Sequence, residues 1–149
     1  MREEPKLDEQ TSAGQVLQMR LVVEAMDYDQ AVAFYRDVLG AREELVVESE
    51  GGAKVTILDV GRATLELSNP AQVAMIDEVE VGRRVSPRLR VAFEVNGAER
   101  VTDDLVEGGA VLIAAPTLTP WQSLNSRLSA PADLQITLFE ELGDQAEST

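Results

Sequence analysis

The sequence predicts an α+β fold built from two tandem βαβββ modules. Three observations support this class: stretches in which apolar and polar residues alternate, two amphipathic segments with helical spacing, and an internal repeat. Residues 20–23 match residues 90–93 at an offset of 70, and residues 65–67 match residues 136–138 at an offset of 71. A tandem duplication within the 149 residues explains both matches.

The first module is expected at residues 16–69. Its first strand begins near Leu17, where apolar side chains occupy every second position. Asp27 or Asp29 can cap the helix that follows, and Gly40 can end it. Three strands are then predicted at residues 44–49, 54–60 and 63–68, with turns at residues 51–52 and 61–62.

The second module is expected at residues 88–141. A linker at residues 70–87 precedes it, and the spacing of Val73, Ile76 and Val79 predicts a short helix within this linker. The second module repeats the pattern of the first, with strands near residues 89–95, 111–114, 123–129 and 134–139 and a helix near residues 98–107.

Composition excludes several kinds of chemistry. Thirteen Lys and Arg against 27 Asp and Glu give a net charge of −14, which disfavours nucleic acids and anionic membranes as partners. There is no Cys and no His, so disulfides, thiolate nucleophiles and imidazole bases are absent. No apolar run is long enough to cross a membrane. We therefore expect a cytoplasmic protein, with a flexible tail at residues 1–15 and an acidic tail at residues 142–149.

Several segments resemble one known superfamily. Residues 27–40, DYDQAVAFYRDVLG, are similar to the first-helix signature of the vicinal oxygen chelate superfamily, which includes glyoxalase I, bleomycin-resistance proteins and extradiol dioxygenases. Residues 65–67 resemble its fourth-strand element, and residues 119–121 with 130–140 resemble its closing hairpin. The resemblance covers about residues 17–142. It implies two βαβββ modules that form a curved mixed-sheet cup, often completed by a second copy of the chain.

The resemblance also identifies four positions at which the metal enzymes of this superfamily hold their ligands. These positions, in the first and fourth strands of each module, are Arg20, Glu66, Arg90 and Thr137. Only Glu66 could bind a metal, because guanidinium groups stay protonated and repel a divalent cation. The closing loop differs as well, since residues 130–133 read APAD where Asp-Pro-Asp-Gly is usual. The resemblance therefore implies a member with no metal, and we expect no other cofactor.

Strand alternation places Arg20, Glu24, Glu66, Arg90 and Thr137 on the face that would line the cup. Two compatible interpretations stay open. Ion pairs among these groups could replace the metal, or a guanidinium could anchor the carboxylate, phenolate or carbonyl of a small molecule. A third interpretation makes Glu66 a general base, but nearby arginines would lower its pKa and so disfavour this role.

The aromatic residues have expected roles too. Trp121, the only tryptophan, either plugs the cup or forms a wall for a planar ligand. Phe34 and Tyr35 are expected to pack the first helix against the sheet.

The function that follows is a small-molecule binding protein that sequesters or senses an organic ligand in the cup without a metal. The alternative is a metal-independent lyase or isomerase in which Glu66 is the base and Arg20 and Arg90 give electrophilic support. A homodimer is expected, because the two half-sheets expose strand edges. The expected ligand-binding residues are Arg20, Glu24, Glu66, Arg90, Trp121 and Thr137.

Overall fold

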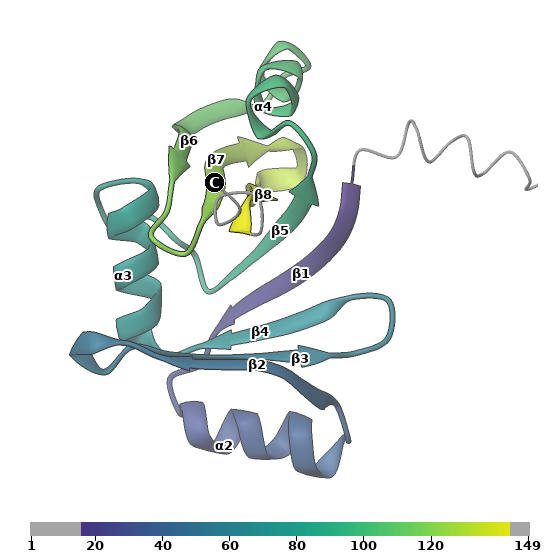
Figure 1. The fold of residues 1–149 in the computed structure, drawn as a ribbon, viewed down its shortest axis with the longest axis vertical. Helices are drawn as coiled ribbons and strands as arrows, with labels where there is room; N and C mark the ends of the chain where they lie inside the picture. Colours follow the sequence, from purple (N-terminus) through teal and green to yellow (C-terminus); the bar gives the residue numbers. More distant parts are fainter. Residues whose placement is uncertain (1–15, 144–149) are drawn as a thin grey trace, which may run out of the picture.

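The computed structural model describes residues 16–143, whose eight strands form one mixed sheet. The strand order is β2-β3-β4-β1-β5-β8-β7-β6, so β1 and β5 lie at the centre and β2 and β6 at the edges (Figure 1). The predicted α+β class is confirmed. The strands are β1 (Val16–Glu24), β2 (Arg42–Glu48), β3 (Lys54–Asp59), β4 (Thr64–Ser68), β5 (Leu89–Val95), β6 (Val111–Leu118), β7 (Ser123–Ala130) and β8 (Leu134–Glu141).

The two halves of the sheet follow the same pattern. In each half the first strand pairs in parallel with the last strand of that half, β1 with β4 and β5 with β8. The antiparallel pair β1–β5 joins the halves. Figure 1 shows the sheet bending at this junction, so the two halves face each other across a concave surface. This surface is built from residues that alternate along each strand.

The first helical segment differs from the predicted regular helix. It begins as α2 (Tyr28–Val32), with Asp27 accepting a hydrogen bond from the backbone N–H of Gln30, and continues as a π-helix over Ala33–Val38. A π-helix has more residues per turn, so α-helical spacing no longer keeps apolar residues on one face. Phe34 is 52% exposed as a result, and the prediction that it packs on the sheet is wrong. Tyr35 does pack against the core cluster of this half.

The second half has the larger core cluster. Helix α4 (Ala98–Glu107) lies on the outer face of the sheet and is strongly amphipathic. Ala98 and Val101 pack against the strands, and the rest of the cluster comes from β5, β7, β8 and Ala110, the residue before β6. This arrangement leaves the concave face of the sheet free of helix α4.

Helix α3 (Pro70–Glu80) lies between the two halves. Figure 1 shows it on the opposite side of the concavity from β1 and β5, running from the β2–β3 hairpin towards β6 and β7. It falls in the segment expected to link the modules. Every helix in the described range is too short or too polar to span a bilayer.

Candidate functional site

A cavity of about 310 Å³ lies between the concave face of the sheet and helix α3. Its polar lining includes side chains from strands β1, β4, β5, β7 and β8 and from helix α3. Its apolar lining comes mainly from β2, β3 and α3. The polar group includes Arg20, Glu66, Gln72, Glu80, Arg90, Asn125 and Thr137, and the apolar group includes Val22, Leu45, Val47, Val55, Ile57, Met75, Ile76, Ala92 and Phe139.

Strand register brings together four of the predicted site residues. Val22 of β1 pairs with both Glu66 of β4 and Arg90 of β5, so these two side chains flank the same position. Ala92 of β5 pairs with Thr137 of β8. Arg20 lies two residues before Val22 on the same face of β1. The four central strands therefore carry the polar end of the cavity.

Arg20 is held by several weak contacts. Its guanidinium lies 3.8 Å from the Glu66 carboxylate and 3.9 Å from that of Glu141. It also lies over the ring of Phe139, 5.0 Å from the ring centroid. Its Nε donates a hydrogen bond of 3.3 Å to Gln18. Arg20 thus has its charge balanced by carboxylates within the protein.

The pKa of Glu66 differs from the sequence prediction that nearby arginines would lower it. Burial raises the pKa of its carboxyl, and the positive charges of Arg90 and Arg20 only partly oppose this effect. The arginines lower the pKa of Glu66 as the sequence predicts, but desolvation exceeds their effect. A carboxyl with a raised pKa can hold or accept a proton nearer neutral pH.

Arg90 is buried without a carboxylate partner. It is 6% exposed, and its Nη1 donates a hydrogen bond of 2.6 Å to the Thr137 hydroxyl. Within residues 16–143, no carboxylate forms an ion pair with it. Burial and the positive charge of Arg127 both lower the pKa of Arg90. The charges of Glu80, Glu66 and Asp77 oppose this effect, but none of these carboxylates forms an ion pair with Arg90, so the cavity contains a desolvated cation without a direct carboxylate partner.

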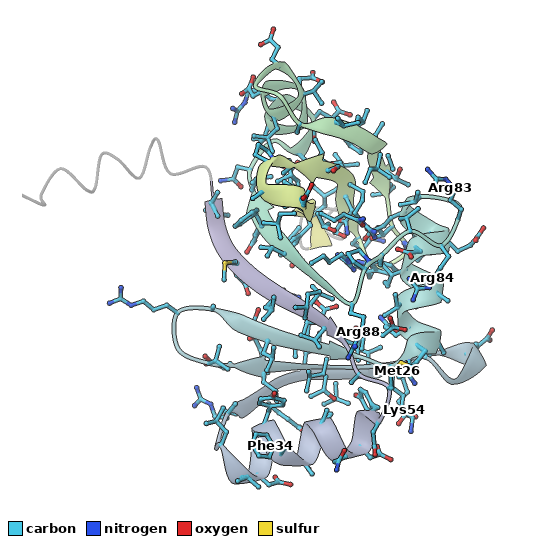
Figure 2. The ribbon with its side chains drawn as sticks, turned by 180° about the vertical axis from the view of Figure 1, so that it is seen from behind. Met26, Phe34, Lys54, Arg83, Arg84 and Arg88 are labelled. Atoms are coloured by element: carbon cyan, nitrogen blue, oxygen red, sulfur yellow. The ribbon has the colours of Figure 1, made fainter. Side chains whose placement is uncertain are left out.

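Two predicted residues take other places. Glu24 does not line the cavity, because it lies at the end of β1 and accepts hydrogen bonds of 3.1 and 3.2 Å from Arg84. Figure 2 shows Arg83, Arg84 and Arg88 along the segment between α3 and β5, which brings Arg84 beside this strand end. Trp121 lines the cavity while remaining 42% exposed, so it forms part of the rim and does not plug the cup.

A buried charge network that reaches the cavity lining through Glu80 and Asn125 was not predicted from the sequence. Arg127 of β7 is fully buried and pairs with Asp77 at 3.0 Å and Glu80 at 2.7 Å, both on helix α3. Glu80 also accepts a hydrogen bond of 2.6 Å from Asn125. The available signal was helical spacing, since Asp77 and Glu80 lie on the same face of α3 as the apolar Val73.

Asp77 is the most strongly hydrogen-bonded carboxylate of this network. Burial alone would raise its pKa, but several donors outweigh that effect: the Ser86 hydroxyl, the backbone N–H groups of Ser86 and Val85, and Arg127. Together they lower the pKa of Asp77 to about 2. The carboxylate therefore stays ionised and fixes the segment after α3 to both α3 and β7.

The donor set at the polar end of the cavity does not fit a divalent metal. Arg20 and Arg90 supply two permanent positive charges, and Thr137 supplies a hydroxyl already bonded to Arg90. Glu66 is the one carboxylate among these four positions. In the described part of the chain, no group of three or more Asp or Glu side chains is arranged to hold a metal.

The fold and the site define a protein with paired βαβββ modules that enclose a ligand-sized cavity. The family model described as Glyoxalase/Bleomycin resistance protein/Dioxygenase superfamily matches residues 18–138. The chain belongs to this superfamily. A comparison with curated protein sequences found no significant match.

Solved structures share the fold at low sequence identity. Methylmalonyl-CoA epimerase from Mycobacterium tuberculosis is 19% identical with a TM-score of 0.60, covering 89% of this chain and 91% of its own. A superfamily member from Vibrio splendidus 12B01 is 12% identical with a TM-score of 0.57, covering 84% and 99%. A mutant of 4-hydroxymandelate synthase from Streptomyces coelicolor is 23% identical with a TM-score of 0.57, covering 86% of this chain and 38% of its own. At these identities the likeness extends to the fold alone.

Proposed function

We propose that this protein binds a small organic anion in the cavity without a metal, and so sequesters or senses that molecule. The observation that carries the proposal is Arg90, a buried guanidinium with which no carboxylate of the described residues forms an ion pair. A desolvated cation in a cavity is stabilised most by an anionic group of a ligand. A planar guanidinium matches a carboxylate in particular, because two parallel N–H groups can bind its two oxygens.

The remaining lining supports a ligand with an apolar body. Valine, leucine, isoleucine and methionine side chains form much of the remaining cavity lining. A cavity of about 310 Å³ lies at the small end of the range for organic ligands. Glu66 lies 3.8 Å from Arg20, and its charge favours the Arg90 cation without a direct ion pair, which leaves the Arg90 guanidinium able to bind a ligand anion.

The experiment is a thermal-shift comparison of phenylacetate with phenylacetamide, which has almost the same shape but no charge. We expect phenylacetate to raise the melting temperature of the wild-type protein and phenylacetamide to leave it unchanged. The Arg90→Met variant should lose the response, and the control Arg42→Met should keep it because Arg42 is 80% exposed on β2. Equal responses to the acid and the amide would contradict the proposal.

A second candidate function rests on the raised pKa of Glu66. In a metal-independent lyase or isomerase, Glu66 would remove a proton from carbon next to a carbonyl, and Arg20 and Arg90 would stabilise the resulting enolate oxygen. Phenylpyruvate in D2O provides a direct assay, because exchange of its C3 protons is visible by NMR. Accelerated exchange that Glu66→Gln abolishes would support catalysis, whereas exchange at the rate of the protein-free solution would reject it.

A further inference from the structure

Six charged side chains, each at most 17% exposed, lie at the polar end of the cavity or in the ion-pair network that reaches it. Three are guanidiniums and three are carboxylates, so their charges balance when all three carboxylates are ionised. Arg84 and Glu24 extend the network at the end of β1 and balance each other. An anion that binds beside Arg90 adds a negative charge to this desolvated group, and the balance is restored if one carboxylate takes up a proton. The guanidiniums are those of Arg20, Arg90 and Arg127, and the carboxylates are those of Glu66, Asp77 and Glu80.

Glu66 is the carboxylate of this group that loses least when it is protonated. Asp77 and Glu80 each bind Arg127, at 3.0 and 2.7 Å, so a proton on either one would break a short ion pair. The Glu66 carboxylate has only a longer contact, 3.8 Å to Arg20. Its side chain lines the cavity and is 15% exposed, so water can deliver a proton to it.

An anion held by Arg90 would lie close to Glu66. Both residues pair with Val22 of β1, one from β4 and the other from β5, so they lie on either side of one position in the sheet. Two strand spacings separate their backbones, which is roughly 10 Å. Both side chains extend from there into the same cavity. A negative charge between them disfavours the ionised form of Glu66, and this effect needs no direct contact with the ligand.

The groups that face Glu66 from the surrounding elements leave its carboxyl easy to protonate. Burial raises its pKa, and the positive charges around it only partly offset this effect. The side chains of β2 and β3 that line the cavity carry no charge. Glu141 of β8 also lines the cavity, but it is 52% exposed and its charge is screened by solvent. The remaining groups are Arg90 of β5, Arg20 of β1 and Ser68 of β4, which lower the pKa of Glu66, and Glu80 of α3, which raises it.

We propose that binding of a carboxylate beside Arg90 is coupled to the uptake of a proton by Glu66. The inference rests on the proposed anion binding and adds that the affinity for the anion falls as the pH rises. The coupling is reciprocal, because an anion that favours the protonated carboxyl must itself bind more tightly to the protein in which that carboxyl is protonated. The chain has no His, so few other groups titrate between pH 6 and pH 8.

A pH-stat titration with phenylacetate, in salt solution without buffer, measures the coupling directly. We expect the wild-type protein to take up protons as phenylacetate binds, to a limit of about one proton per ligand. The association constant should fall between pH 6 and pH 8, by at most about tenfold per pH unit for one coupled proton. Phenylacetate stays ionised throughout this range, so the ligand does not take up the proton itself.

Substitution of Glu66 assigns the proton to a residue. Glu66→Gln should bind phenylacetate without proton uptake and with an affinity that does not change with pH. Glu66→Met is a second variant without a titratable group, in case the first does not fold. The matched control is Glu43→Gln, which removes an exposed carboxylate paired with Arg36 and should keep the proton uptake of the wild type.

The outcomes separate this inference from the proposed function. If phenylacetate binds the wild-type protein but not Arg90→Met, and neither proton uptake nor a change of affinity with pH is found, the coupling is rejected while anion binding stands. Proton uptake that persists in a Glu66 variant would assign the proton to another group and would also overturn the inference. If phenylacetate does not bind the wild-type protein between pH 6 and pH 8, both proposals are rejected. Proton uptake that depends on both Arg90 and Glu66 supports both.

Discussion

Asp77 of helix α3 and Arg127 of strand β7 form a 3.0 Å ion pair in which both side chains are fully buried. Arg127 also binds Glu80 one turn further along the same helix. The pair therefore fixes α3, which belongs to neither half of the sheet, to the second half. Because α3 also supplies Gln72, Met75 and Ile76 to the cavity, this contact helps to determine the shape of the candidate site.

Asp77→Asn is expected to destabilise the protein strongly. Removing one partner of a buried ion pair typically costs about 3–5 kcal/mol, and because Glu80 still pairs with Arg127 we expect a loss at the lower end of that range. Glu43→Gln is the control, because the Arg36–Glu43 pair is shorter, at 2.8 Å, but exposed. Exposed pairs contribute about 0–1 kcal/mol. Urea denaturation measures both variants, and similar losses for the two would contradict the importance of burial.

Acid should weaken the fold through the same carboxylate. The pKa of Asp77 is about 2 in the folded protein, against 3.8 in an unfolded chain. A lowered pKa contributes stability that is fully present above pH 4 and is lost as the pH falls towards 2, and the difference corresponds to about 2 kcal/mol. The free energy of unfolding should therefore fall more steeply between pH 4 and pH 2 for the wild type than for Asp77→Asn. Parallel pH profiles would contradict this assignment.

The fold was accessible from the sequence because its signals are local. Alternation in β1 and the repeat at 70 residues identified the paired modules and the cavity-facing side of Arg20, Glu66, Arg90 and Thr137. The π-helical turn was not accessible, since DYDQAVAFYRDVLG has ordinary helical spacing and the wider winding depends on tertiary packing.

The site was only partly accessible for a similar reason. Alternation assigns a face, but it does not say what covers that face. Helix α3 buries the cavity and thereby changes the pKa of Glu66, and it brings Gln72 and Glu80 to the lining. Glu24 lies on the expected face of β1, yet Arg84 binds it at the strand end, outside the cavity. These contacts depend on a segment between the modules whose position is fixed by long-range packing.

The purified protein is expected to contain no stoichiometric divalent metal. Arg20 and Arg90 occupy two of the four positions where metal ligands would be needed, and a cation placed there would face two positive charges. Elemental analysis by mass spectrometry, after purification without chelators, measures the content directly. One equivalent of zinc, nickel, iron or manganese that is lost in Glu66→Gln would contradict the prediction.

A homodimer is expected in solution. The edge strands β2 and β6 expose apolar residues, among them Val46 at 47% and Val111 at 65%. Light scattering should give about twice the 16.2 kDa of one chain. Val46→Lys or Val111→Lys should shift the protein towards monomer. The control Met26→Lys should not, because Met26, labelled in Figure 2, lies outside both edge strands. A wild-type mass near 16.2 kDa would contradict the prediction.

Glu66 and Arg90 should be coupled energetically although they form no direct ion pair. Burial raises the pKa of Glu66, so ionising this carboxyl costs stability as the pH rises above 4.5. The free energy of unfolding of Glu66→Gln should therefore increase relative to that of the wild type over this pH range. The same substitution removes a negative charge that favours the Arg90 cation. Arg90→Met should therefore be more stabilising in the Glu66→Gln background than in the wild type, with a coupling free energy of about 0.5–3 kcal/mol. Urea denaturation of the four proteins at pH 7 gives this value, and additive effects would mean that the two side chains do not share one cavity.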